Sequence, residues 1–218
     1  MVDAQPSPDD TPSLTVLDHP IADDAIRQLR DHRTEPPTFR EAMHRLTMLL
    51  AVEALRGAPR RMMSVQTPLE VTEASTLERR VLIAPILRAG LGMVDPILRL
   101  TPDAVVGCLG FYRDEQSLEA VPYYEKLPTA QDDWLTLVVD PMLATGGTAV
   151  AALDLLVSQG FTHLHLLSAI AAPEGVATVH ASHPGVPIFT GSLDRQLNDQ
   201  GYILPGLGDA GDRQLGTL

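Results

Sequence analysis

Short apolar runs rich in Val, Leu and Ile recur through the middle and the end of the chain. Polar residues, Gly and Pro bound these runs, which is the pattern of strands buried on both faces of a sheet. The runs are VLIAP (81–85), AVVGCLGFY (104–112), WLTLVVD (134–140), HLHLLSAIA (163–171) and VPIFTGS (186–192).

Helical spacing occupies the stretches before and between these runs. Apolar residues recur every three or four positions over residues 22–55, and Pro36 and Pro37 interrupt the pattern, so two helices are predicted there. A further helix is predicted over residues 148–160, with Gly160 as its C-cap. Because strands and helices alternate, the sequence predicts an α/β fold with a mostly parallel twisted sheet flanked by helices.

The two ends of the chain differ in composition. Residues 1–15 are rich in Pro, Ser and Asp and are predicted to be a disordered tail, whereas residues 16–218 are predicted to form a single domain. No apolar run reaches the ~18 residues that a membrane span needs, and the acidic start does not resemble a signal peptide. We therefore expect a cytoplasmic protein. The single cysteine, Cys108, excludes an internal disulfide.

The charge balance limits the partners. The net charge is −12, which disfavours a broad nucleic-acid-binding face, because phosphate backbones are held by clustered Lys and Arg. No nucleic-acid or membrane partner is predicted. A phosphate-bearing small molecule would have to be held by a few local cations. Trp134, Met62 and Met63 are expected to pack in the interior.

The turn ATGGT (144–148) lies between the strand 134–140 and the helix that follows it. Ligands of open α/β sheets bind at the carboxyl ends of the strands. Gly146 and Gly147 allow backbone N–H groups to converge on an anion at the helix N-terminus, so the turn could hold a phosphate; a tight turn without a ligand is the alternative. The ATP-binding P-loop lysine and the G-x-G-x-x-G pattern are both missing. Asp140 beside such a phosphate would be repelled unless it faces hydroxyls or a metal, and a sugar phosphate offers hydroxyls.

The segment DPMLATGGT (140–148) resembles the phosphoribosyl-diphosphate motif of the type I phosphoribosyltransferases. Its Pro in place of a second acidic residue is typical of the uracil-specific members. Further segments resemble that family in the expected order: HPIADDAIRQLRD (19–31), APILRAGLGM (84–93), FYRDEQSLEAVPYYEKLP (111–128), AAPEGV (171–176) and GYILPGLGDAGDRQLGT (201–217). The resemblance runs from about residue 18 to the end, and departs mainly in residues 57–78.

The resemblance implies a fold, a reaction and partners. The expected fold is that of the type I phosphoribosyltransferases, with an N-terminal helical segment and a C-terminal base-binding loop. The expected reaction transfers the 5-phosphoribosyl group from 5-phosphoribosyl 1-diphosphate, here called the donor, to uracil, giving UMP and diphosphate. The donor would carry Mg²⁺, with no direct metal ligand from the protein. A homodimer or higher homo-oligomer, and GTP as an activator, are also implied.

The resemblance also implies the site residues. Asp140, Arg88 and Asp209 are the expected catalytic residues. Uracil would be contacted by Ile203, Gly208, Asp209 and Ala210. The donor would be bound by Arg88, Arg113, Asp140, Pro141, Met142, Leu143, Ala144, Thr145, Gly146, Gly147, Thr148 and Asp209.

The residues themselves are compatible with these roles. Arg88 lies in a glycine-bounded turn directly after the strand 81–85, where its guanidinium could grip a diphosphate, although an ordinary surface arginine fits the same pattern. Residues 113–127 resemble the family's flexible hairpin near the active site, and a solvated charged loop would have the same composition. The segment GYILPGLGDAGD (201–212) has few side chains that could recognise a base, so we expect recognition by the backbone. An irregular C-terminal tail is the alternative.

Two other functions remain open at this point. Some phosphoribosyltransferase-like proteins are RNA-binding regulators, and the net charge argues against that function here. A phosphoribosyltransferase that uses another base is the second alternative.

Overall fold

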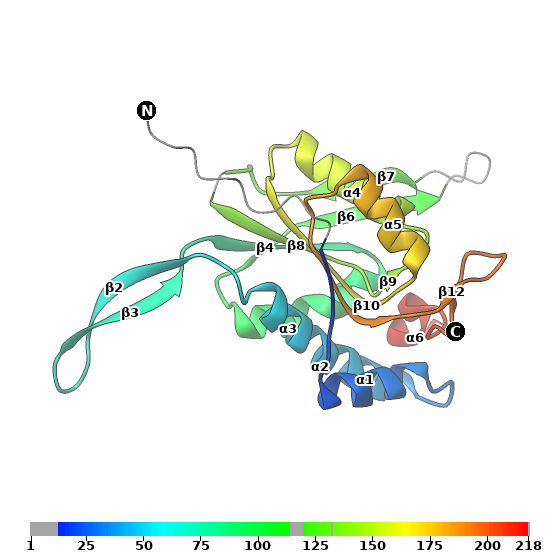
Figure 1. Ribbon diagram of the computed structural model, residues 1–218, viewed down its shortest axis with the longest axis horizontal. Helices are drawn as coiled ribbons and strands as arrows, with labels where there is room; N and C mark the ends of the chain where they lie inside the picture. The colour runs from blue at the N-terminus through cyan, green and yellow to red at the C-terminus, as the bar shows by residue number, and fades with distance from the viewer. Residues whose placement is uncertain (1–12, 114–119, 132, 218) are drawn as a thin grey trace.

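The computed structural model describes residues 13–113, 120–131 and 133–217 (Figure 1). Its central sheet has the strand order β1-β11-β10-β8-β4-β6-β7, with β5 paired to β4 and β9 paired to β10. All pairs in this sheet are parallel except β6–β7. The strands are β1 (Leu14–Val16), β4 (Arg80–Leu87), β5 (Val105–Val106), β6 (Cys108–Arg113), β7 (Ala120–Lys126), β8 (Trp134–Val139), β9 (Met142–Leu143), β10 (His163–Ala171) and β11 (Ile188–Leu193).

Helices cover both faces of this sheet (Figure 1). They are α1 (Pro20–Arg30), α2 (Pro36–Ala54), the 3₁₀ helix η1 (Ala89–Met93), α3 (Val94–Leu100), α4 (Gly147–Ser158), α5 (Pro173–Ser182) and α6 (Ala210–Leu215). None of the helices in the described ranges is long and apolar enough to cross a membrane. The prediction of a mostly parallel sheet flanked by helices is confirmed.

The apolar runs fill two cores, one on each face of the sheet. Val139 of β8 packs in the core that contains Phe39 and Leu46 of α2, whereas its neighbour Val138 packs in the core that contains Leu153 of α4. Successive side chains of a strand point to opposite faces, so a strand between two helical layers has to be apolar at every position. This explains why the runs are continuous rather than alternating.

The predicted helices lie close to their expected positions. Pro36 and Pro37 occupy the first turn of α2, where a missing N–H costs no helical hydrogen bond. They therefore begin α2 and also interrupt the apolar spacing that continues from α1. Gly160 follows α4 with φ of 93°, and Phe161 N donates to Leu156 O at 3.0 Å across it, as in a glycine-terminated helix.

Two boundaries differ from the sequence prediction. Leu14 and Thr15, which the prediction placed in the disordered tail, lie in β1, where Leu14 pairs with Ile188; residues 1–12 lie outside the described part. The short strand gains its stability from pairing with β11, which the local composition does not reveal. The predicted strand 104–112 is divided at Gly107, which ends β5 and precedes β6.

A two-stranded hairpin is formed by β2 (Arg60–Gln66) and β3 (Val71–Leu77), and it projects from the rest of the chain (Figure 1). The prediction that Met62 and Met63 pack in the interior is wrong for the single chain, because their exposed fractions are 58% and 47%. Trp134 is buried, as predicted, and the Arg80 guanidinium lies 4.3 Å from its ring centroid.

Candidate active site

The turn between β8 and α4 is shaped by close packing against α5. Gly146 has φ of 86°, which disfavours residues with a side chain. A Cβ atom there would lie 2.8 Å from both the carbonyl oxygen of Gly175 and the Cβ of Thr178. Gly175 and Thr178 of α5 therefore pack directly against the turn. The N-terminus of α4 lies at the carboxyl end of β8, where an anion would be stabilised.

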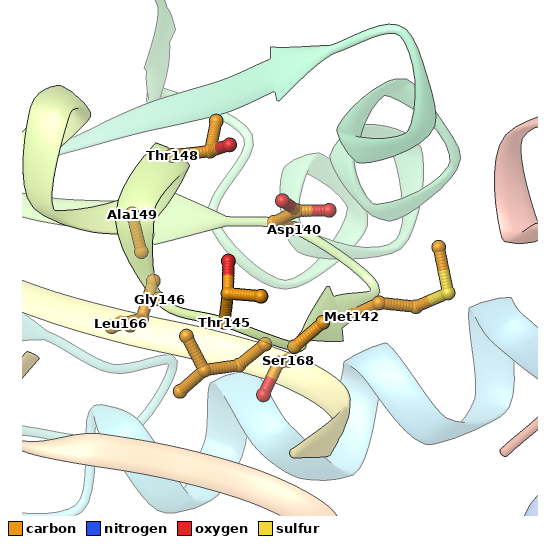
Figure 2. A pocket seen from close by; sticks show the side chains of 10 residues that line it. Asp140, Met142, Thr145, Gly146, Thr148, Ala149, Leu166 and Ser168 are labelled. Atoms are coloured by element: carbon orange, nitrogen blue, oxygen red, sulfur yellow. The ribbon is translucent and has the colours of Figure 1, made fainter. Parts of the chain in front are cut away.

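A small cavity of about 100 Å³ lies at this turn. In Figure 2 the carboxylate of Asp140 and the hydroxyl of Thr145 point to the same side of the turn, whereas the hydroxyl of Ser168 points away. The lining residues are Asp140, Met142, Leu143, Ala144, Thr145, Gly146, Thr148, Ala149, Leu166 and Ser168. Pro141 and Gly147, also predicted, belong to the same turn without lining the cavity.

Ala149, Leu166 and Ser168 were missed by sequence reasoning. Ala149 directly follows the predicted turn, whereas Leu166 and Ser168 lie on β10, which pairs with β8 in parallel. A strand that pairs in parallel with β8 places residues beside the turn, but no single segment of the sequence shows which strand that is.

The electrostatic environment of Asp140 favours its neutral form. Burial and the nearby charge of Asp209 together raise the pKa of the Asp140 carboxyl to about 7, against the opposing hydrogen bond from the backbone of Met142. The Asp140 carboxyl therefore loses its proton at a much higher pH than an exposed carboxyl does. Hydroxyl donors or a cation brought by a ligand would favour the ionised form.

Arg88 follows β4 directly and lies at the start of η1. Its Nη2 lies 3.2 Å from Oδ1 of Asp212 in α6, and most of the Arg88 side chain is exposed. The ion pair brings the turn after β4 against the C-terminal segment. Arg113 ends β6, where its backbone pairs with Ala120; its side chain lies outside the described part, so its predicted role stays a prediction.

A second cavity, of about 380 Å³, is formed mainly by the C-terminal loop. Its lining residues are Met142, Ala144, Ile170, Gly201, Tyr202, Ile203, Pro205, Gly206, Leu207 and Gly208. Two of the four predicted uracil contacts, Ile203 and Gly208, thus line it. Asp209 and Ala210 follow directly at the start of α6, where Oδ1 of Asp209 accepts a hydrogen bond from the backbone N–H of Asp212 at 2.9 Å.

The two cavities adjoin, because Met142 and Ala144 line both. One has a helix N-terminus and a carboxylate, and the other is mostly backbone and apolar side chain. This arrangement is suited to a ligand with a phosphate at one end and a small heterocycle at the other.

Comparison with known proteins identifies the family. The family model described as uracil phosphoribosyltransferase matches residues 16–217. The chain belongs to this family. It is 50% identical to the uracil phosphoribosyltransferase of Roseiflexus castenholzii over 202 residues, which covers 93% of this chain and 97% of the relative. The relative from Dictyoglomus thermophilum is 46% identical over 205 residues, or 94% of this chain and 99% of that protein.

Solved structures support the same fold. The AQ2163 protein from Aquifex aeolicus has a TM-score of 0.87 and 37% identity, with 92% of this chain and 97% of that chain covered. The adenine phosphoribosyltransferase from Leishmania donovani has a TM-score of 0.60 and 13% identity, covering 88% of each chain, and shows the fold alone. The predicted type I phosphoribosyltransferase fold and the uracil-specific family are thus confirmed. As a uracil phosphoribosyltransferase, the chain is an enzyme that forms UMP from uracil and the donor.

Proposed function

We propose that the cavity at the α4 N-terminus binds the 5-phosphate of the donor and that the adjoining cavity of the C-terminal loop binds uracil. The observation that carries this assignment is the shared wall of Met142 and Ala144, which brings the two ligand ends together. The ribose would lie between them, with Asp140 facing its hydroxyls. Asp209 is close enough to Asp140 for its charge to raise the pKa of the Asp140 carboxyl.

The reaction is a displacement at the anomeric carbon of the ribose. The bond from this carbon to the diphosphate oxygen breaks, a bond to a ring nitrogen of uracil forms, and that nitrogen loses its proton. Positive charge develops on the ribose in an oxocarbenium-like transition state. In our proposal the ionised Asp140 stabilises this charge and orients the hydroxyls. Arg88, with Arg113 as the second cation, receives the charge of the leaving diphosphate.

Mg²⁺ bound to the donor is part of this proposal. The ion would neutralise the diphosphate and make it a better leaving group. The residues present fit such a cation, because the charge of Asp209 raises the pKa of Asp140, and a positive ion on the donor would offset this repulsion between carboxylates.

A structure of the complex with UMP tests the assignment of the two cavities. We expect the 5-phosphate within hydrogen-bond distance of the backbone N–H groups of residues 145–148 and the uracil ring against Ile203 and Gly208. A phosphate bound elsewhere, or a base outside the loop cavity, would contradict the assignment.

Self-association through the β2–β3 hairpin is the second part of the proposal. An isolated two-stranded hairpin is only marginally stable in water, and this one exposes apolar side chains. These are Met62, Met63, Val65, Leu69, Val71 and Leu77. A second copy of the chain is the partner that the resemblance implies, and it would cover the methionines that the single chain leaves exposed.

The double variant Met63→Glu with Val71→Glu is expected to dissociate this oligomer. Sedimentation of the unaltered chain should give at least twice the chain mass, and the variant should fall to 23.5 kDa, because buried unpaired carboxylates oppose association. Ile21→Glu, at a position on α1 that is 50% exposed, is the matched control and should keep the oligomer. A monomeric unaltered chain, or an oligomeric double variant, would contradict the proposal.

GTP activation would act through a separate groove. A groove of about 1350 Å³ lies at the amino ends of β8, β10 and β11, opposite the carboxyl ends that form the active site. It contains Arg79, His163 and His165. Arg79 is half-buried and forms no ion pair with a carboxylate in the described ranges, although the chain is strongly acidic. It is therefore suited to the phosphates of GTP.

Replacing Arg79 with alanine tests this groove. In the proposal GTP raises the turnover of the unaltered chain, and Arg79→Ala increases the half-effective GTP concentration about tenfold or more, while the GTP-independent rate stays the same. Arg99→Ala, which removes an exposed arginine paired with Asp95, serves as the control. An Arg79→Ala enzyme with an unchanged GTP response would refute this site.

A further inference from the structure

A partly buried ion pair contacts the loop that lines the base cavity. Arg30, the last residue of α1, donates from Nη2 to Oδ1 of Asp194 at 2.6 Å and from Nη1 to Oδ2 at 2.8 Å. The Asp194 side chain is 1% exposed. Burial alone would raise the pKa of Asp194, but the hydrogen bonds from Arg30, Gly206 and Ser192 outweigh it and hold the pKa below its usual value. The carboxylate of Asp194 is thus held in its ionised form by hydrogen bonds, despite its burial.

This ion pair holds both polar backbone groups of Gly206. The N–H of Gly206 donates to Oδ2 of Asp194 at 2.9 Å, and its carbonyl accepts from Nη1 of Arg30 at 3.1 Å. Gly206 has φ of 66°, and a Cβ atom there would lie 2.1 Å from the carbonyl oxygen of Ile203. The turn at Gly206 therefore packs tightly on Ile203. The peptide groups on either side of Gly206 are held by the charged side chains of Arg30 and Asp194.

A second arginine holds the next residue of the loop. Arg213 of α6 donates from Nη1 to the carbonyl of Leu207 at 2.7 Å and also to the carbonyl of Leu29. Its Nη2 donates to the carbonyl of Asp31 at 2.6 Å. The Arg213 guanidinium lies 4.6 Å from the ring centroid of Phe39, which packs in the core of α2. The end of α1 and the base loop are thus tied together by two arginines.

We propose that Arg30, Asp194 and Arg213 are positioning residues that fix the backbone of Gly206 and Leu207 for uracil recognition. This inference rests on the proposed assignment of the base cavity. None of the three residues lines that cavity, so each acts through the peptide groups of the loop. The backbone groups that these residues bind are already hydrogen-bonded, and holding them fixes the directions of the remaining N–H and C=O groups of the loop. A base recognised by the backbone has to meet those remaining groups as fixed donors and acceptors.

The consequence is a selective effect on uracil binding. Greater mobility of the loop should weaken uracil binding. Donor binding should stay unchanged, because the phosphate turn is supported by α5. A merely structural role predicts something else: a smaller active fraction or a lower melting temperature, with the KM for uracil unchanged in the molecules that remain folded. Comparing the changes in the KM for uracil, the KM for the donor and kcat therefore distinguishes a positioning role from a structural role.

The pair of variants Arg30→Lys and Arg27→Lys gives a matched test. Both residues lie on α1, but Arg27 forms an exposed ion pair with Asp24. Lysine at position 30 keeps the positive charge and loses the bidentate contact with Asp194. We expect Arg30→Lys to raise the KM for uracil about tenfold, with kcat and the KM for the donor within about twofold, and Arg27→Lys to leave all three unchanged. Equal changes in both KM values, or none, would overturn the inference.

Two further variants keep the test decisive. Ser192→Ala removes a hydroxyl that donates to Oδ1 of Asp194 at 2.9 Å and accepts from Arg30 at 3.0 Å. This variant should raise the uracil KM by a smaller factor than Arg30→Lys, and it replaces Arg30→Lys as the test if Arg30→Lys fails to fold. An unchanged KM in Ser192→Ala would then overturn the inference. Ile203→Ala alters the cavity wall directly. If Ile203→Ala leaves the uracil KM unchanged, the base cavity itself is wrongly assigned; if only Ile203→Ala changes it, the positioning role alone fails.

Discussion

Replacing Arg88 with alanine is expected to lower kcat/KM for the donor by about 100-fold or more, as when one preorganised charge-stabilising group is removed from an active site. Arg88 lies directly after β4, and its guanidinium is largely exposed beside Asp212. In our proposal this guanidinium binds the leaving diphosphate. Charge on the leaving group grows as the bond to the ribose breaks. The lost interaction is therefore strongest in the transition state, and kcat should fall with kcat/KM.

The stability of the Arg88→Ala variant should change little. The ion pair with Asp212 is mostly exposed, and such pairs contribute at most about 1 kcal/mol. Arg99→Ala, which removes a similarly exposed arginine on α3, provides the control and should retain full activity. Steady-state kinetics with both substrates varied decide the matter: kinetics that match those of the Arg99→Ala control would remove Arg88 from the mechanism.

Asparagine at position 140 is expected to reduce kcat by about 100-fold, because in our proposal the negative charge of Asp140 stabilises the cationic ribose. Burial and Asp209 raise the pKa of Asp140 to about 7, so the carboxylate forms only as the pH rises through neutrality. The kcat/KM of the unaltered enzyme should therefore rise between pH 6 and pH 8. In Asp140→Asn this rise should disappear. Near-normal turnover at saturating substrates would show that Asp140 has no such role.

The same variant should be more stable than the unaltered chain at alkaline pH. Because the pKa of Asp140 is higher in the folded state than the ordinary value of 3.8, the folded state binds the proton more tightly, and stability is lost as the pH rises from about 4 to about 7. Asp140→Asn escapes this loss. Its melting temperature should exceed that of the unaltered chain by a few degrees at pH 8, and the difference should shrink towards pH 4. A lower melting temperature at pH 8 would mean that the carboxylate is stabilising instead.

Much of the sheet could be predicted because its strands are buried on both faces. Val138 and Val139 pack in different cores, so both had to be apolar, and the continuous run revealed the strand. β1 could not be predicted, because Leu14 is stabilised by pairing with Ile188, a residue far along the chain. Local composition carries no trace of such a partner.

The hairpin was missed for a different reason. Two strand-like runs flank a TPLE turn, which is a hairpin signal, but Met62 and Met63 were interpreted as core residues because large apolar side chains are usually buried. Their exposure in the single chain shows that an apolar pattern predicts burial without saying against what.

The candidate site divides in the same way. The turn from Asp140 to Thr148 could be predicted because its glycines and carboxylate lie together in the sequence. The contact of Arg30 with Asp194 could not, because these residues are 164 positions apart and meet only when α1 packs beside β11. Sequence reasoning thus finds the groups expected to touch the ligand more readily than the groups that hold them in place.

The most direct test is the formation of UMP from radiolabelled uracil with the donor and Mg²⁺, with cytosine and hypoxanthine as parallel acceptors. Uracil alone should be converted, and removal of Mg²⁺ with a chelator should stop the reaction. Turnover of hypoxanthine would contradict the base assignment. No turnover with any base, by a protein that still binds the donor and retains RNA on a filter, would indicate a regulatory protein instead of an enzyme.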